Sequence, residues 1–400
     1  MKQFWVLAMG LLVTATASFS SGYAQLSSYL NIVDAEATAG AGAVPPLNFP
    51  TDMAFTPDGT MLFVTEKGSG SPARARVRVY DLQPDGLSYA LRAQPFVDVS
   101  VSLLSGYHER GLTSIAVDSY YPFFPYVYLY RTALNASGQP VLRISRFEDL
   151  GGGVGGNGVI LRDFPLLNNT HRHVAAKLRH NPYDFMLYIA IGDNNVPARA
   201  QSLSQPHGKV HRINPYDGSV PEDNPFPGSS VWAYGLRHLF AISVNPFTGE
   251  LYGVDNGENC DDRAMKIVPG QNYRWGLAPT PNCPFSPSVI WRSGTAPGNQ
   301  VSPAGLTFLW YDFYTGFFPG DMLFGEWNTG DIRRITLFGD ALDQGTPPDR
   351  FYNGTPTSTG RITAVEQAPN GYVYFTSCIV SAMFPTGCPA GASRLFRLNP

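Results

Sequence analysis

Histidine and arginine side chains recur along this chain in short segments that precede or open apolar runs. The first segment, His171-Arg172-His173, lies just before an apolar stretch that begins at Leu178. An imidazole titrates near neutral pH, so a histidine held in a cavity can take a proton from a substrate hydroxyl. A surface-loop histidine is the plainer interpretation. A metal-binding His-x-His pair is a third, although no further ligand is apparent from the spacing.

Two arginine segments and one acidic segment offer groups that could bind a ligand. Tyr234-Gly235-Leu236-Arg237-His238 carries a guanidinium that suits a carboxylate, or that links two structural units. Gly360-Arg361-Ile362-Thr363 carries a second arginine. The run Asp-Asn-Gly-Glu-Asn-Cys-Asp-Asp at 255–262 has oxygen ligands suited to a hard cation such as calcium. Its spacing is not that of an EF-hand, so a solvated acidic loop remains an alternative.

The elements that must position these groups repeat about every 62 residues. Each copy has a short apolar strand, a turn with Pro or Asp, and a second strand rich in Tyr, Phe, Leu and Val. The copies begin near Met53, Ile115, Leu178, Ile242 and Val365, with a looser one around Leu306. Alternation within each unit indicates strands. The six units therefore predict an all-β fold, a six-bladed β-propeller of four-stranded antiparallel blades, with function where the blades converge.

Composition agrees with one large repeat domain. The 400 residues include 41 Gly and 34 Pro but only 15% charged residues, which is typical of many short strands joined by tight turns. We expect residues 25–48 to be a flexible lead-in and residues 49–400 to form a single propeller domain. The strand-like segment Arg394–Leu398 is placed to close the ring beside N-terminal strands. A net charge of -3 gives no sign of a nucleic-acid partner.

The N-terminus has the pattern of an export signal. Lys2 supplies positive charge, residues 4–17 are apolar, and Gly22-Tyr23-Ala24 offers small residues for cleavage. We therefore expect residues 1–24 to be a signal peptide and the mature protein to be secreted or periplasmic. The apolar run is shorter than a typical membrane-spanning helix, and no other apolar segment reaches its length. We therefore expect no membrane span.

The four cysteines fit an oxidising compartment. Cys378 and Cys388 are close in sequence within a loop that contains Gly and Pro, so they form a natural pair. Cys260 would then pair with Cys283. The rival interpretation, four sulfurs on one metal ion, lacks the C-x-x-C spacing that zinc sites usually show.

In order and at blade spacing, these segments resemble the soluble quinoprotein glucose/sorbosone dehydrogenase family, which includes aldose sugar dehydrogenases that use pyrroloquinoline quinone (PQQ). The resemblance spans about residues 45 to 400. The matching segments are Glu109-Arg110-Gly111-Leu112, His173 through Leu178, Ile191-Gly192-Asp193, Gly208 through Pro215, Tyr234 through Arg237, Asn259-Cys260-Asp261-Asp262 and Gly360-Arg361-Ile362.

The resemblance implies an oxidoreductase that oxidises the anomeric carbon of aldose sugars by hydride transfer to PQQ. By the same resemblance, His173 is the catalytic base and Asp193 orients it. Arg237 and Arg361 fall at positions that bind the acidic cofactor. An external electron acceptor is then required.

A calcium ion and a sugar site are implied in the same way. The carbonyls of Gly257 and Glu258 match those that hold calcium, which polarises the accepting carbonyl of the quinone as a Lewis acid. Glu109 matches a sugar-contacting position, and Asp262 is expected to bind substrate as well. The substrate is therefore expected to be a small sugar.

Several positions depart from the family pattern. Lys177 stands where His-x-Gly-Gly-Arg would place Arg, and Ala175-Ala176 replaces the two glycines. Asn328 replaces a lysine that often contacts the cofactor, Thr363 replaces a second arginine, and His238 replaces an asparagine. Lys177 and His238 are candidates to compensate. Two alternatives therefore stay open: a quinone-free propeller that binds a glycan or protein partner, and a calcium-dependent lactonase.

Overall fold

The computed structural model describes residues 31–36, 46–105, 109–174, 177–258, 261–277, 288–293, 300–311, 313–314, 319–355, 360–378, 388 and 393–400. The expected signal peptide at 1–24, the pair Ala175-Ala176, and both Cys260 and Cys283 lie outside these ranges. The described part of the chain is built of strands, with short 3-10 turns at Leu167–Asn169 and Pro197–Gln201. None of its helices has the length and apolar character needed to cross a bilayer.

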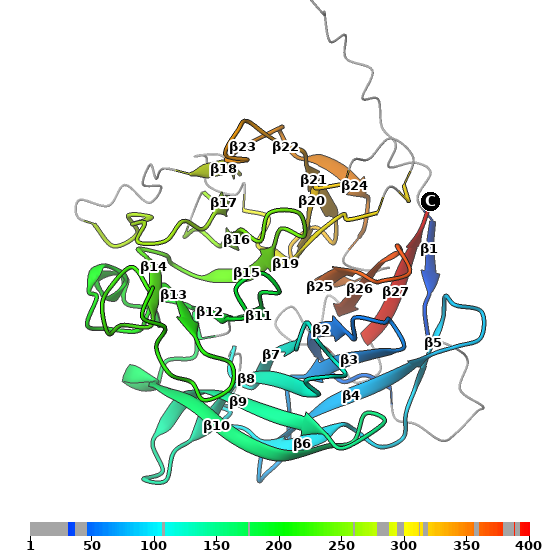
Figure 1. Cartoon of the computed structure of the whole chain (residues 1–400), viewed down its shortest axis with the longest axis horizontal. Coiled ribbons are helices and arrows are strands. Elements are labelled where there is room, and N and C mark those ends of the chain that lie inside the picture. Colours follow the sequence, from blue (N-terminus) through cyan, green and yellow to red (C-terminus); the bar gives the residue numbers. More distant parts are fainter. Residues whose placement is uncertain are drawn as a thin grey trace, which may run out of the picture.

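Six antiparallel sheets surround a common centre, as Figure 1 shows. From the inside outward, the first blade has β2 (Pro50–Phe55), β3 (Met61–Glu66) and β4 (Arg74–Leu82) with β5 (Tyr89–Leu91) and β6 (Val97–Ser100). The second blade has β7 (Leu112–Val117), β8 (Tyr126–Leu134), β9 (Pro140–Asp149) and β10 (Gly155–Pro165). The third blade has β11 (Leu178–His180), β12 (Leu187–Ile191), β13 (Lys209–Ile213) and β14 (Val231–Tyr234). In the first blade both β5 and β6 pair with β4.

The remaining blades follow in chain order. They are β15 (Leu239–Val244), β16 (Leu251–Asp255), β17 (Arg263–Lys266) and β18 (Val289–Arg292); β19 (Pro303–Phe308), β20 (Met322–Glu326), β21 (Ile332–Ile335) and β24 (Asp349–Tyr352); β25 (Arg361–Gln367), β26 (Val373–Cys378), β27 (Ser393–Asn399) and β1 (Asn31–Asp34). A small hairpin, β22 (Leu337–Phe338) with β23 (Gln344–Gly345), follows β21. The predicted six-bladed propeller is confirmed.

The second strand of each blade is buried on both faces. All residues of β3, β12, β16 and β20 are buried, because neighbouring blades pack against both sides of each sheet. One apolar cluster joins Ile144, Leu178, Ile189 and Met265 from three consecutive blades. A strand that is buried on both faces has a continuous run of apolar residues, and such runs form the second half of each sequence repeat.

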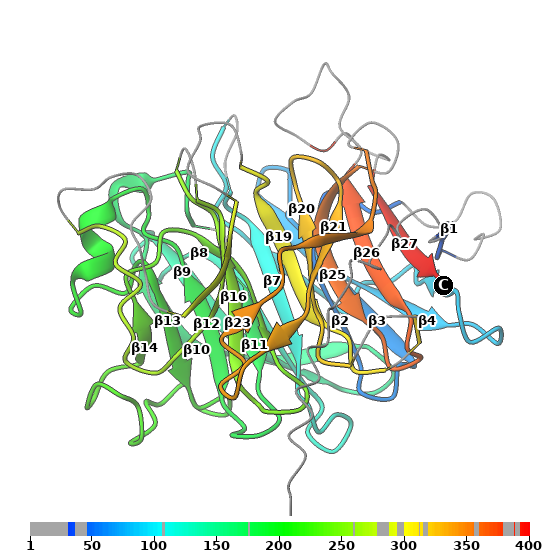
Figure 2. The same cartoon turned by 90° about the horizontal axis from the view of Figure 1, so that it is seen from above.

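The first and last strands of the chain close the ring. Strand β1 pairs antiparallel with β27 in the register Asn31↔Asn399 to Asp34↔Phe396. Figures 1 and 2 show β1 beside β27 and the C-terminus. The predicted closure by the C-terminal strand is confirmed, but the flexible lead-in predicted for 25–48 is wrong for residues 31–34. Four residues flanked by Ala, Gly and Ser carry too little strand pattern to be recognised without their partner.

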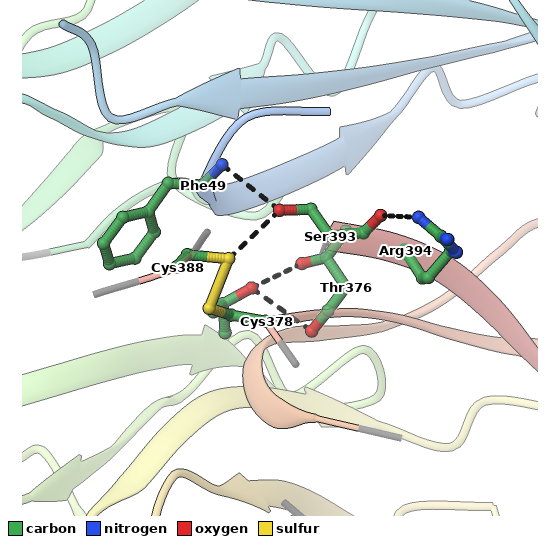
Figure 3. The surroundings of a disulfide bond; sticks show 7 residues. Phe49, Thr376, Cys378, Cys388, Ser393 and Arg394 are labelled. Carbon is green, nitrogen blue, oxygen red and sulfur yellow. Dashed lines mark hydrogen bonds between the residues drawn. A yellow bond between two sulfur atoms is a disulfide. The ribbon is translucent and has the colours of Figure 1, made fainter. Parts of the chain in front are cut away.

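A disulfide braces this closing blade. Cys378 at the end of β26 is bonded to Cys388, which confirms the predicted pair (Figure 3). The Cys388 sulfur lies 3.2 Å from the Ser393 hydroxyl, which also accepts a hydrogen bond from the backbone N–H of Phe49 at 3.2 Å. The bridge therefore anchors the start of β27 against the segment that enters the first blade.

Candidate active site

The amino ends of the innermost strands surround a cavity of about 360 Å³, which we call the front cavity. Its walls come from two kinds of segment: the loops that enter each innermost strand, and the turns that leave each second strand. The lining residues include Phe49, Thr51, Lys67, Glu109, Arg172, His173, Lys177, Arg237, His238, Asn256, Gly257, Glu258, Gln300, Ser302, Trp327 and Thr363. Most of the predicted site residues thus meet in one place.

His173 and Asp193 form a close pair at the wall of this cavity. The His173 Nδ1 lies 2.6 Å from the Asp193 Oδ1, while the Asp193 Oδ2 accepts a hydrogen bond from the indole N–H of Trp275 at 2.8 Å. Burial alone would raise the pKa of Asp193, but the hydrogen bonds from His173 and Trp275 and nearby positive charge hold it below the usual value. An ionised Asp193 keeps a proton on Nδ1, so the Nε2 of His173 is left as an acceptor toward the cavity.

The backbone around His173 is strained and closely supported. Its φ of 55° lies in the left-handed region, which non-glycine residues rarely occupy. The His173 carbonyl accepts a hydrogen bond from the Asn194 side chain at 3.1 Å. A Cβ on Gly192 would come within 2.4 Å of that carbonyl oxygen, so only glycine permits this close approach. The imidazole is therefore positioned by its neighbours before any ligand arrives.

His238 and Glu109 extend the site beside the base. The His238 ring stacks on the His173 ring with centroids 5.0 Å apart, and its Nε2 lies 3.4 Å from the Glu109 Oε2. The same Glu109 oxygen accepts the backbone N–H of Val174 at 3.1 Å. Glu109 thus ties the residue after His173 to the cavity wall and leaves its carboxylate facing the cavity.

Arg237 has a guanidinium group with spare donors. One Nη donates to the carbonyl of Asn256 at 2.9 Å, and the group lies 5.5 Å from the centre of the Trp275 ring. Its Nε is buried and has no hydrogen-bond partner in the described part of the chain, where Arg237 also forms no ion pair. A buried donor without an acceptor is costly, so this wall favours a ligand that carries acceptor oxygens.

Arg361 is not among the residues that line the cavity, but it contacts one that does. Its guanidinium carbon lies 5.2 Å from the centre of the Trp327 ring, and Trp327 lines the cavity. Its Nε is also buried without a partner among the described residues. Thr363 lines the cavity, but its hydroxyl is hydrogen-bonded to Thr376 on β26, 3.2 Å from the carbonyl oxygen and 2.8 Å from the hydroxyl oxygen. Asn328 points its amide at the Gln300 carbonyl and the Ser302 hydroxyl, 3.0 Å from each, and does not line the cavity.

Lys177 lines the cavity, but its ammonium group is held by other protein groups. Its ammonium lies 2.9 Å from the Asp52 carboxylate and donates to the Thr51 carbonyl at 2.5 Å. Burial alone would raise the pKa of Asp52, but Lys177 and Arg179 hold it below the usual value. The pair is therefore a buried ion pair, and compensation by Lys177 for a missing cofactor contact has no support in this geometry.

The acidic loop is organised by Asp262. This carboxylate accepts backbone N–H groups from Gly257 at 2.9 Å, Val301 at 2.7 Å and Ser302 at 2.8 Å, and it is not among the residues that line the cavity. Direct substrate contact by Asp262, as expected from the sequence, therefore has no geometric support. Its role is to fold the loop that presents Gly257 and Glu258.

The cation ligands expected on this loop are carbonyl oxygens. Gly257 and Glu258 both line the cavity, and the Asn256 side-chain oxygen is buried without a partner among the described residues. The Gln300 amide donates to the Glu258 carbonyl. The described ranges contain no group of three or more His, Cys, Asp or Glu side chains arranged to hold a metal ion. A cation here would therefore depend on carbonyl and amide oxygens.

Lys67 is a cavity residue that sequence reasoning missed. Its ammonium lies 4.7 Å from the centre of the Phe49 ring. Burial lowers its pKa to about 8, although the charge of Glu109 opposes this shift. Lys67 therefore adds a titratable cation to the wall that holds Glu109.

A repeated signal marks the positions that leave the second strands. Strands β3, β16 and β20 each end on a buried acid that pairs with an arginine of the next strand: Glu66 with Arg78, Asp255 with Arg263 and Glu326 with Arg333. The residue after each acid lines the front cavity, namely Lys67, Asn256 and Trp327. A search of the sequence repeats for an acid at the end of each second strand would identify these three cavity residues.

Comparison with known proteins gives a family match over most of the chain. The model of the family named Glucose / Sorbosone dehydrogenase matches residues 47–378. An uncharacterised protein of Synechocystis sp. is 26% identical over 367 residues, which is 82% of this chain and 81% of that protein. The aldose sugar dehydrogenase YliI of Escherichia coli K12 is 32% identical over 124 residues, 30% of this chain and 33% of that protein.

Solved structures share the fold. A candidate glucose dehydrogenase of Thermus thermophilus superposes with a TM-score of 0.69 at 25% identity, covering 92% of this chain and 100% of that one. The PQQ-bound aldose sugar dehydrogenase of Streptomyces coelicolor has a TM-score of 0.64 at 22% identity and covers 92% and 98% of the two chains.

Proposed function

Because the chain belongs to the glucose/sorbosone dehydrogenase family, we propose that it oxidises the anomeric carbon of aldose sugars with PQQ as hydride acceptor and calcium as assistant. The PQQ bound to the Streptomyces coelicolor relative supports the choice of cofactor. Removal of a hydride from the anomeric carbon and a proton from its hydroxyl yields a lactone. An external electron acceptor is then needed for the next turnover.

The unsatisfied arginines carry this proposal. The Nε atoms of Arg237 and Arg361 are both buried without partners in the described ranges. Each guanidinium lies against an indole ring, Trp275 or Trp327, which fixes its plane. PQQ is planar and carries several carboxylates, so it suits flat, cation-bearing walls. Each charged hydrogen bond of this kind typically contributes about 1.5–3 kcal/mol.

The residues of the cavity supply the proton chemistry. When bound, PQQ supplies a two-electron acceptor and calcium supplies Lewis-acid polarisation. The Nε2 of His173 accepts the proton of the anomeric hydroxyl, while Asp193 holds the other ring nitrogen protonated. The imidazolium that forms is stabilised by the ionised Asp193. General-base assistance of this kind is typically worth about 10²–10⁴-fold in rate.

Glu109 and His238 would position the sugar. Glu109 places a carboxylate on the cavity wall within 3.4 Å of the His238 Nε2. A carboxylate accepts hydrogen bonds from sugar hydroxyls, and a ring nitrogen can donate or accept. We propose that these two groups orient the anomeric carbon beside His173.

Calcium would be held by the loop that Asp262 folds. The neutral oxygens available are the carbonyls of Gly257 and Glu258 and the unpartnered side-chain oxygen of Asn256. The Gln300 amide would have to leave the Glu258 carbonyl for that oxygen to bind a cation. This requirement predicts that calcium shifts the local structure around Gln300.

A quinone-free propeller is the second candidate. It is favoured by Asn328, whose amide is committed to Gln300 and Ser302, and by Thr363, whose hydroxyl is committed to β26. These positions supply no charge to a polyanionic cofactor. In this version the front cavity would bind a glycan or a protein partner without turnover.

Export remains part of the proposal. The pattern of residues 1–24 and the disulfide between Cys378 and Cys388 both support an oxidising compartment. Mass spectrometry of the protein from its native host should find a mature N-terminus at Gln25. A retained Met1 would contradict processing.

The activity is tested by reconstitution. The purified protein, loaded with PQQ and calcium chloride, should reduce an artificial electron-acceptor dye when aldoses are added, and a His173→Ala variant should lose this turnover. Loss in the variant would argue against the quinone-free alternative. Failure of the wild-type protein to bind PQQ in a titration would end the dehydrogenase version.

A further inference from the structure

The opposite end of the propeller carries a second surface. A cavity of about 360 Å³, the back cavity, lies at the carboxyl ends of the innermost strands. Turns that join each innermost strand to the second strand surround it, and their described residues are 56–60, 118–125, 181–186, 245–250, 309–311, 313–314, 319–321 and 368–372. A strand of six residues spans about 20 Å, so this face is well separated from the front cavity.

Aromatic side chains are exposed on four consecutive turns of this face. Their exposed fractions run from 37% for Trp310 to 87% for Phe123. We call this set the aromatic arc, and its members are Tyr120, Phe123, Phe124, Tyr183, Phe185, Phe247, Trp310 and Tyr311. A large group of exposed rings on one face usually marks a binding surface.

The arc is continuous from blade to blade. The rings of Tyr120 and Phe185 lie 5.2 Å apart, which joins the second blade to the third. The Tyr183 hydroxyl donates to the Pro246 carbonyl at 2.6 Å, which joins the third blade to the fourth. A Cβ on Gly320 would lie 3.9 Å from the Phe247 ring, so the fifth blade follows directly.

The charge of these turns restricts the partner. No Lys or Arg occurs in the sequence segments 56–60, 118–125, 181–186, 245–250, 309–321 and 368–372, whereas Asp58, Asp118, Asp184, Glu250, Asp312 and Asp321 do. Anionic membranes and nucleic acids need basic side chains at the contact, so both are disfavoured. The partner must offer apolar faces to the rings and be uncharged or cationic.

We propose that the aromatic arc binds an uncharged polysaccharide chain. The faces of a pyranose ring are C–H surfaces that stack on aromatic rings, while its rim carries hydroxyl groups. The turns place the half-buried carboxylates of Asp184 and Glu250 and the exposed hydroxyl of Thr248 among the rings, and these groups can hydrogen-bond such hydroxyls. A spread of rings over four blades suits an extended chain of sugars better than a single small molecule.

The floor of the back cavity adds further polar groups. Arg179 bridges two carboxylates, at 3.4 Å from the Asp52 oxygen and 3.6 Å from the Glu366 oxygen. Glu366 lines this cavity, and its side chain is 25% exposed. A hydroxymethyl or hydroxyl group that entered this cavity would find an acceptor there. The inference goes beyond sugar oxidation and does not depend on it, because binding needs neither quinone nor calcium.

A depletion assay tests the proposal. The chain without PQQ or calcium is mixed with insoluble cellulose, chitin, xylan or β-1,3-glucan, and the protein left in solution is measured over a concentration series. The wild-type chain should be retained by at least one of these neutral polymers. A triple variant, Phe123→Ala, Phe124→Ala and Trp310→Ala, should bind at least about 10-fold more weakly.

The controls separate binding from folding and from other partners. Phe338→Ala removes a similarly exposed ring from the β22–β23 hairpin, outside the arc, and should leave binding unchanged. Thermal unfolding should show the triple variant to be as stable as wild type, because all three rings are exposed. Equal retention of the triple variant, or no retention of wild type by any neutral polymer, would overturn the proposal. Arc-dependent dimerisation, or arc-dependent binding to phosphatidylcholine vesicles, would also overturn it.

Discussion

Asp193→Asn tests the role of the buried carboxylate with almost no change in shape. Asp193 accepts from the His173 Nδ1 at 2.6 Å, from the Asn195 backbone at 2.8 Å and from the Trp275 indole at 2.8 Å. An asparagine has one acceptor oxygen and one donor nitrogen, so it cannot satisfy both the His173 and Trp275 donors. If its nitrogen faces His173, the ring must protonate on Nε2 and can no longer act as a base.

The expected loss follows from the proton-transfer step. General-base catalysis contributes about 10²–10⁴-fold, so kcat of the PQQ- and calcium-loaded variant should fall by that factor, or about 2.7–5.5 kcal/mol in activation free energy. Stability should fall by about 1.5–3 kcal/mol, because one charge-assisted hydrogen bond is lost. Steady-state kinetics with an aldose and a dye would measure the first effect, and urea unfolding the second.

A matched control removes a carboxylate charge away from the cavity. Asp163→Asn disrupts the pair of Asp163 with Arg143, whose atoms lie 2.6 Å apart on the outer strands of the second blade. This variant should keep full activity. An Asp193→Asn enzyme with kcat within threefold of wild type, or with unchanged activity and altered PQQ binding only, would refute the reasoning.

Three further predictions follow from close contacts. Gly192→Ala should lower kcat by about 10²-fold without changing PQQ binding in a titration, because its Cβ displaces the His173 carbonyl; equal loss of both would contradict it. Burial raises the pKa of Glu366 from 4.5 to about 7, so the stability of the wild-type protein falls as pH rises through this window. The Glu366→Gln variant should therefore be more stable than wild type by up to about 3 kcal/mol at pH 8 but not at pH 4. Urea unfolding at both pH values measures this difference, and a difference that does not depend on pH would refute it. Asn328→Lys should tighten PQQ binding about tenfold or more by adding a cation, measured by titration, and unchanged affinity would count against the charge argument.

Much of the fold was predictable because burial repeats. The second strands are covered on both faces, so their apolar runs stand out, and the turns with Pro and Asp mark where each begins. Strand β1 could not be predicted, since its four residues become a strand only by pairing with β27, more than three hundred residues later. A contact of that separation leaves no local pattern in the sequence.

The site was predictable where position in the blade decides orientation. His173 and Arg237 lie in the segments that lead into innermost strands, so both face the front cavity. Lys177 lines the cavity and Asp262 does not, but the charged groups of both are bound to buried partners, Asp52 and the backbone amides of a loop respectively. Side-chain direction at such positions depends on partners from distant segments, which spacing alone does not identify.

Binding of PQQ to the wild-type chain and to Arg237→Met is the most direct test of the account. The central claim is that the front cavity binds an anionic quinone through Arg237, which lines it and whose Nε has no hydrogen-bond partner in the described ranges. Equilibrium titration should show saturable binding by wild type and a loss of affinity of about 10- to 150-fold in the variant, which corresponds to one charged hydrogen bond. Absence of saturable binding by wild type, or equal affinities for the two proteins, would contradict it.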